Sequence, residues 1–367
     1  MLQPDKKIIA IRSLYSVDHA TNIPPTVLIV SWNLGKRCNY DCSYCGDLVH
    51  DAVSPFVNKS DALIAIDNLH SYAVENNKTI SWGFTGGEPF IDPSFMNMLE
   101  VISSKSTTHS VVVSSNGSLP LSVYLQASQY VTNLTISIHQ ERSVSEIART
   151  INTIKELNKL PSLNLSVTVM FVAGSTTNTE SIIKDLTSSG VKTILRKIRP
   201  PADTHQFESL TKNKKDRVLL DVEKQKEIRL ATKKTYDTKA LWLRQEYYTE
   251  QEHAFAEVYY AKEKVWNNMG VWYEGDNYSE INSDEMLTHN THTFTNWICF
   301  AGVDSLYIDF DGSVYRGNCY VDGAIGHIKS GIQFKQHPIK CNLIWCTCNT
   351  DMTVRKCSKT KYLKLIT

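Results

Sequence analysis

The sequence is most informative in what it lacks. No apolar run reaches the length of about 18 residues that a membrane span needs. The N-terminal residues contain no hydrophobic segment of the kind found in secretory signals. The formal net charge is only +1, which gives no general argument for nucleic acid or membrane binding. These absences predict a cytoplasmic protein without a membrane partner.

Cysteine is also missing from most of the chain, between positions 45 and 299. The nine cysteines fall into an early group of three and a late group of six. An odd, clustered set in a chain without an export signal favours metal ligation in a reducing compartment over disulfides. The length of 367 residues is sufficient for one large domain and a smaller one.

The early cysteines, Cys38, Cys42 and Cys45, have the spacing C-x3-C-x2-C and follow an apolar run, 26–32, that predicts a buried strand. A loop this short can direct three thiolates to one face of an iron–sulfur cluster. On a four-iron cluster, three ligands leave one iron open for chemistry. The alternatives are a zinc knuckle and a disulfide framework. A closed zinc site needs four ligands, and the next cysteine is far away in the sequence.

Strand-like and helix-like stretches alternate from residue 26 to about residue 199. This pattern predicts six β/α units and a parallel sheet with right-handed crossovers. Six units are too few to close an eight-stranded barrel, so we expect an α/β fold with a partial (β/α)6 TIM-like barrel. Ligands bind beyond the carboxyl ends of such strands, where the Cys38 loop would lie. The predicted strands are 26–32, 79–85, 110–114, 134–138, 163–171 and 193–198, and the predicted helices are 61–73, 93–103, 121–130, 143–160 and 179–189.

A second motif, Thr-Gly-Gly-Glu-Pro at 85–89, directly follows the second predicted strand. Glycines permit close approach of the backbone, and a carboxylate can accept hydrogen bonds from an ammonium group. Together with the C-x3-C-x2-C loop, this motif resembles the radical S-adenosylmethionine (SAM) superfamily. The resemblance implies cleavage of SAM beside a [4Fe-4S] cluster. It also implies SAM-binding roles for a set of residues that follow successive strands: Gly86, Gly87, Glu88, Ser115, Asn116, Ser137, His139 and Arg149. His139 stands where relatives have aspartate, and Arg142 is an alternative to Arg149.

Residues 200–296 fit no repeating β/α unit. The stretch 192–244 has fifteen Lys and Arg against seven Asp and Glu, and 246–287 is acidic and aromatic. One interpretation is a helical insertion with complementary solvated faces. The other is a substrate-binding insertion in which the basic stretch contacts phosphate. We therefore expect four segments: 1–25, the barrel 26–199, the insertion 200–296 and a final domain, 297–367.

The late cysteines surround a predicted β-hairpin, in which Asp311-Gly312 separates two strands. A hairpin flanked by Cys299 and Cys319 and followed by a Cys-rich tail resembles the SPASM and Twitch auxiliary-cluster modules of radical SAM enzymes. The resemblance implies a small Cys-rich C-terminal domain with a second [4Fe-4S] cluster. Its expected ligands come from Cys299, Cys319, Cys341, Cys346 and Cys348, whereas Cys357 is expected to lie apart. A structural zinc site remains the alternative.

The resemblance as a whole implies an oxidoreductase of the maturase type that forms a 5′-deoxyadenosyl radical from SAM and takes a hydrogen atom from a substrate. A ribosomally made peptide, oxidised or cross-linked at a side chain, is the first expectation. A nucleotide or nucleic acid comes second, followed by a carbohydrate-like molecule. A flavodoxin or ferredoxin is the expected reductant. A non-enzymatic iron–sulfur electron carrier is the remaining alternative, but a carrier has no need of the Gly-Gly-Glu motif.

Overall fold

The computed structural model describes most of the barrel and parts of the remaining chain. The described residues are 8–11, 26–42, 44–45, 50–198, 248–262, 269–274, 277–282, 286, 292–343, 346 and 348–357. Within these ranges no helix is both long and apolar enough to cross a membrane.

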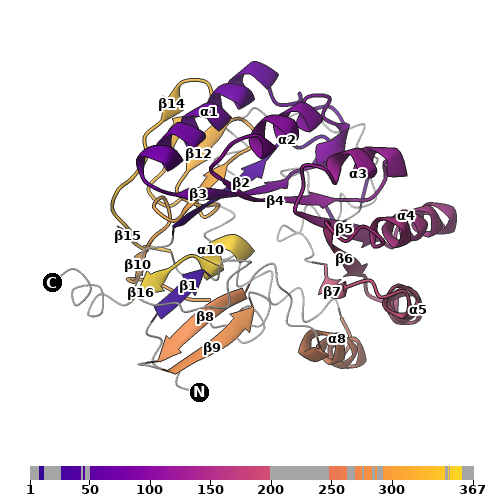
Figure 1. The fold of residues 1–367 in the computed structure, drawn as a ribbon. Coiled ribbons are helices and arrows are strands. Elements are labelled where there is room, and N and C mark those ends of the chain that lie inside the picture. Colours follow the sequence, from indigo (N-terminus) through magenta and orange to yellow (C-terminus); the bar gives the residue numbers. More distant parts are fainter. Residues whose placement is uncertain are drawn as a thin grey trace.

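The largest sheet contains six parallel strands in chain order, each paired with the next. The helices between them lie on the outer side of the sheet, so the strands form the inner side of an open, partial barrel (Figure 1). The strands are β2 (Val27–Asn33), β3 (Thr79–Thr85), β4 (Thr108–Ser115), β5 (Asn133–His139), β6 (Asn164–Phe171) and β7 (Thr193–Lys197). The helices are α1 (Lys59–Glu75), α2 (Phe95–Ser103), α3 (Leu121–Ala127), α4 (Val144–Leu157) and α5 (Thr176–Ser188).

These elements confirm the predicted partial barrel, with boundaries that differ by a few residues. The main core lies between the strands and their helices, where large side chains such as Trp32, Trp82 and Phe95 are almost fully buried. Helix α4 begins at a capping box: the hydroxyl of Ser143 accepts the N–H of Glu146, whose carboxylate accepts the N–H of Ser143.

The predicted C-terminal hairpin is present and extends the barrel sheet. Strand β11 (Ser305–Ile308) pairs in parallel with β2, and β12 (Ser313–Tyr315) pairs antiparallel with β11. Strands β13 (Ala324–His327) and β14 (Gly331–Ile332) continue the same sheet to its edge. The residues that follow β11 therefore lie at the same end of the sheet as the Cys38 loop.

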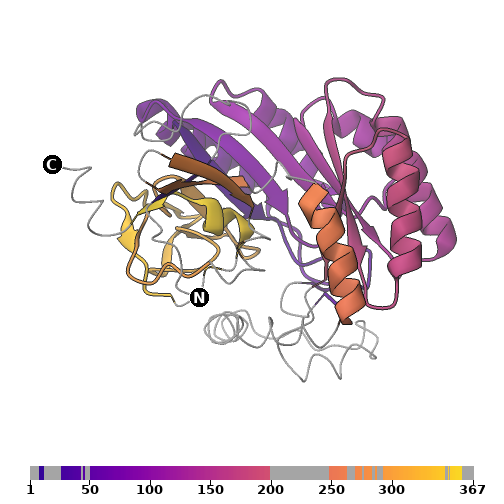
Figure 2. The same cartoon turned by 90° about the horizontal axis from the view of Figure 1, so that it is seen from below.

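A second sheet is assembled from distant parts of the chain, in the order β15-β10-β16-β1-β8-β9. Strand β1 lies between a strand from the C-terminal region and a strand from the insertion, so this sheet spans three of the predicted segments. It lies near the β2 side of the barrel (Figure 2). Its strands are β1 (Ile8–Ile11), β8 (Met269–Glu274), β9 (Asn277–Asn282), β10 (Ile298–Cys299), β15 (Ile339–Lys340) and β16 (Lys356–Cys357).

The expected insertion is described only in part. Helix α8 (Glu250–Lys262) packs beside β7, and the hydroxyl of Tyr248, just before it, donates to the carbonyl of Phe171 at 2.6 Å. The insertion therefore contains a helix, as expected, and also the β8–β9 hairpin, which was not expected. Residues 199–247, which include most of the basic stretch, lie outside the described residues.

Candidate functional site

The three early thiols lie in the loop that follows β2. The loop is anchored at its start because the N–H of Cys38 donates to the carbonyl of Asp51 at 2.9 Å. A turn, in which the N–H of Cys45 donates to the carbonyl of Cys42 at 3.1 Å, brings the other two cysteines together. Cys38 and Cys42 are buried, and Cys45 is half-buried. The loop thus collects three thiols at the carboxyl end of the parallel strands.

The electrostatics of these thiols suit a cationic metal group. Burial raises the pKa of Cys38 to about 11, and the nearby Glu88 and Cys45 act in the same direction. The pKa of Cys42 is also raised, first by its hydrogen bond with Cys45 and then by burial. Metal ligands must be thiolates, so three of them here require positive charge from the bound group. The donor set fits an iron–sulfur cluster. Within the described part of the chain, no site for a metal ion is formed by three or more His, Cys, Asp or Glu side chains.

The glycines of the second motif allow the loops after β2 and β3 to pack closely. A Cβ atom at Gly87 would lie 1.9 Å from the carbonyl oxygen of Arg37, and one at Gly86 would lie 2.7 Å from that of Gly35. The N–H of Gly87 donates to the carbonyl of Gly35 at 2.8 Å, and the N–H of Glu88 donates to that of Arg37 at 3.0 Å. These glycines thus allow close packing against the backbone of the Cys38 loop, whereas their close approach to a ligand remains a prediction.

Glu88 joins the loops after β3 and β4. One carboxylate oxygen accepts the hydroxyl of Ser115 at 2.9 Å and the N–H of Phe90 at 3.2 Å, and the other accepts the N–H of Asn116 at 2.7 Å. The side chain is only 2% exposed. Burial raises its pKa to about 7, although the three donors favour the carboxylate form. Glu88 therefore contacts two other predicted SAM-binding residues directly, Ser115 and Asn116.

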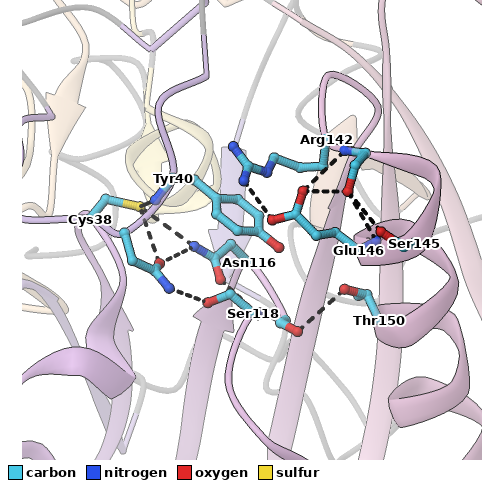
Figure 3. A network of polar contacts seen from close by, with 11 residues as sticks. Cys38, Tyr40, Asn116, Ser118, Arg142, Ser145, Glu146 and Thr150 are labelled. Atoms are coloured by element: carbon cyan, nitrogen blue, oxygen red, sulfur yellow. Dashed lines mark hydrogen bonds and ion pairs between the residues drawn. The ribbon is translucent and has the colours of Figure 1, made fainter.

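Asn116 connects this group to the cysteine loop (Figure 3). Its Nδ2 lies 3.5 Å from Sγ of Cys38 and donates to Oδ1 of Asn39 at 3.0 Å. Asn39 in turn donates to the hydroxyl of Ser118 at 2.8 Å. A continuous polar network therefore runs from Glu88 to the first thiol.

His139, at the end of β5, approaches the cysteine loop from the other side. Its Nδ1 lies 2.6 Å from the hydroxyl of Tyr44 and 3.3 Å from Sγ of Cys42, and its ring stacks on that of Tyr44. Burial lowers the pKa of His139 to about 4, so its imidazole is neutral at pH 7. A neutral ring cannot replace the charge of an aspartate. The contact between His139 and SAM therefore cannot be the same charge-assisted one, and it remains a prediction.

The other two predicted residues of this set are less closely associated with the thiols. Ser137 is half-buried within β5, and Arg149 is exposed on α4. Arg142 lies nearer: its guanidinium is 4.4 Å from the centre of the Tyr40 ring, and it pairs with Glu146 at 2.6 Å (Figure 3). The aromatic contribution of Tyr40, which also lies within the cysteine motif, was not predicted.

The late cysteines gather around the second sheet and the short helix α10 (Asn349–Thr353). Cys299 lies on β10, and the N–H of Cys319 donates to the carboxylate of Asp351 in α10 at 2.8 Å. Burial raises the pKa of Cys346, and Cys319 and Cys299 contribute in the same direction, which places these thiols near one another. Cys341 is also buried, whereas Cys348 is half-buried at the start of α10. The cysteines are thus brought into one module, as expected, although the ligand set itself remains a prediction.

Comparison with known proteins gave one curated relative and several similar folds. No protein-family profile matches the chain. A GTP 3′,8-cyclase from Microcystis aeruginosa is 34% identical over 92 residues, which are 24% of this chain and 26% of that protein. The chain therefore matches about a quarter of the length of this relative.

Two solved structures have a similar arrangement of elements. One is anSMEcpe with bound AdoMet, with 14% identity, a TM-score of 0.48 and coverage of 83% of this chain and 75% of the other. The second is SuiB from Streptococcus suis bound to its precursor peptide SuiA, with 13% identity, a TM-score of 0.46 and coverage of 84% and 65%. The match to the curated relative covers too little of either chain to show a family.

Proposed function

We propose that this chain cleaves SAM reductively at the Cys38 loop and uses the resulting 5′-deoxyadenosyl radical to take a hydrogen atom from a substrate. The observation that carries this proposal is the convergence of three thiols with Glu88 and Asn116 at the carboxyl end of the parallel strands. When bound by Cys38, Cys42 and Cys45, a [4Fe-4S] cluster would supply an open iron for the methionine end of SAM and the electron for its cleavage.

The protein's own groups provide binding and orientation. Glu88 is the acceptor for the amino group of SAM, because it is the buried carboxylate next to the thiols. Ser115 and the backbone of Asn116 hold that carboxylate in place, and the side chain of Asn116 holds the position of Cys38. The loops around Gly87 are tightly packed against the backbone of Arg37 in the same region.

For the substrate, we propose a side chain of a ribosomally made peptide, which would be oxidised or cross-linked. The support is the cysteine-rich module beside the barrel, because auxiliary-cluster members of the superfamily that the chain resembles frequently act on such peptides. An auxiliary cluster with ligands drawn from Cys299, Cys319, Cys341, Cys346 and Cys348 could accept an electron from the substrate radical, which favours a net oxidation.

A nucleotide is the second candidate substrate. One observation favours it: the name of the curated relative specifies GTP as its substrate. Incubation of the reduced enzyme with GTP, and separately with small peptides encoded next to its gene, would distinguish the two classes. A modified peptide mass together with unchanged GTP would support the first proposal, and the opposite result would support the second.

The cleavage reaction is tested with anaerobically reconstituted protein, SAM and a strong reductant. We expect the wild type to produce 5′-deoxyadenosine and the triple variant Cys38→Ala/Cys42→Ala/Cys45→Ala to produce none. The control is Cys357→Ala, which removes a cysteine outside both proposed ligand sets and should leave cleavage intact. Undiminished cleavage by the triple variant would refute the proposal.

A further inference from the structure

Lys356 carries an almost fully buried ammonium group in the second sheet. Its exposed fraction is 1%. The ammonium donates to three backbone carbonyl oxygens, those of Asp351, Met352 and Val354. No Asp or Glu among the described residues forms an ion pair with it. Carbonyl groups satisfy its donors but do not neutralise its charge, and a buried lysine normally requires an anion.

The second sheet places Lys356 beside the late cysteines. In the antiparallel pairing of β10 with β16, Lys356 is directly opposite Cys299, so the two side chains share one face of the sheet. Cys357, the next residue, points to the other face. Lys356 Nζ also lies 5.0 Å from the centre of the Phe294 ring, and Phe294 packs in the same buried cluster as Cys346.

Helix α10 connects the ammonium to a third cysteine. The backbone carbonyl of Asp351 accepts a hydrogen bond from Lys356, and its carboxylate accepts the N–H of Cys319. Burial raises the pKa of both Cys299 and Cys346, whereas the charge of Lys356 lowers it. Among the described residues, the negative groups that act on this ammonium are the thiols of Cys299, Cys346 and Cys319, when ionised, together with the carboxylate of Asp351.

We propose that Lys356 is a positioning residue that compensates the negative charge of an iron–sulfur cluster held by the late cysteines and raises its reduction potential. This inference depends on the auxiliary cluster of the proposed function. Four thiolates around a [4Fe-4S]2+ core carry a net charge of about −2, and a one-electron reduction adds one more negative charge. A fixed buried cation stabilises the reduced form more than the oxidised form, because the attraction grows with the charge.

The test compares Lys356→Met with Lys356→Arg, both in the Cys38→Ala/Cys42→Ala/Cys45→Ala background, which leaves only the C-terminal cluster. The midpoint potential is measured by redox titration with electron paramagnetic resonance. We expect a more negative potential for Lys356→Met and a nearly unchanged one for Lys356→Arg. Lys340→Met is the control, because it removes an exposed lysine from β15 of the same sheet and should leave the potential unchanged. Equal potentials in all four proteins would overturn the proposal.

If the Lys356→Met variant does not bind its cluster, the iron content of the variants is measured instead of the potential. Loss of iron in Lys356→Met, with iron retained in Lys356→Arg, supports the role of the charge. Equal loss in both variants, with iron retained in Lys340→Met, overturns it and indicates a role in packing. If the background protein itself contains no iron, the auxiliary cluster and this inference both fail. SAM cleavage by the otherwise wild-type enzyme would still be tested separately at the Cys38 loop.

Discussion

The carboxylate of Glu88 links two loops that are 28 positions apart in the sequence. Its ligand-binding role was predicted from the resemblance to radical SAM enzymes, and the motif at 85–89 and Asn116 each follow a strand of one parallel sheet. Their convergence follows from that topology. The contact between His139 and Tyr44 was not predictable in the same way. It depends on how the cysteine loop folds back over β5, and no local pattern specifies this.

We expect Glu88→Gln to weaken SAM binding by about 10- to 150-fold, because a charge-assisted contact contributes roughly 1.5–3 kcal/mol. Calorimetric titration of the reconstituted protein with SAM measures the Kd. Glu100→Gln, on the exposed side of α2, is the control and should not change it. An unchanged Kd for Glu88→Gln would show that Glu88 only holds the loops together.

The same residue predicts a pH dependence. The pKa of Glu88 in the folded protein is about 7, above its ordinary value of 4.5, so the folded state retains this proton to higher pH than the unfolded state. The contribution of Glu88 to stability therefore falls as the pH rises from about 4.5 to about 7. Chemical denaturation across this pH range should show that the free energy of unfolding falls in the wild type and falls less in Glu88→Gln.

At the scale of elements, the attachment of β11 to the barrel depends on Asp304, immediately before the strand. Its backbone carbonyl accepts the N–H of Ile29 in β2 at 2.9 Å, and its carboxylate accepts two hydrogen bonds from Arg355, at 2.9 and 3.2 Å. Asp304 is 1% exposed. The hairpin was predicted from Asp311-Gly312. The pairing of β11 with β2 was not predicted. A turn signal identifies the two strands of a hairpin, but it does not identify the strand that pairs with the outer edge of the hairpin.

Removal of Arg355 should therefore be costly. We expect Arg355→Met to lower the free energy of unfolding by about 3–5 kcal/mol, because it leaves the Asp304 carboxylate buried without its partner. The double variant Arg355→Met/Asp304→Asn should recover part of that loss, since it also removes the buried charge at position 304. Denaturant unfolding measures both, and an effect below about 1 kcal/mol for Arg355→Met would contradict a structural role for this pair.

At the scale of the whole molecule, the barrel was predictable from the alternation of apolar strands and helices, but the second sheet was not. Strand β1 lies between β16 and β8, and a pairing between such distant short segments leaves no periodic signal in the sequence. For the same reason the position of Lys356 opposite Cys299 was missed. Only the clustering of the late cysteines indicated that this region forms one site.

One cysteine group lies in the loop after β2 and the other around the second sheet, and this separation predicts two separable clusters. We expect the reconstituted wild type to contain about eight irons and Cys319→Ala about four. Cys319→Ala should also destabilise the C-terminal module, because metal ligation there contributes folding free energy. Metal analysis and thermal unfolding measure both effects. SAM cleavage without substrate should largely survive, whereas four irons and zinc in the wild type would contradict the second cluster.

The place of β1 in the second sheet also has a consequence for synthesis on the ribosome. Its partner Cys357 is made 349 residues after Ile8, which takes roughly 20–70 s at typical elongation rates. During that interval the nascent chain can complete strands β2 to β7. The outer edge of β2 remains unpaired until β11 has been made. An unpaired edge of this kind invites association with other chains. We therefore expect a chaperone to protect this edge mainly after the barrel has been made and before synthesis of the last hundred residues is complete.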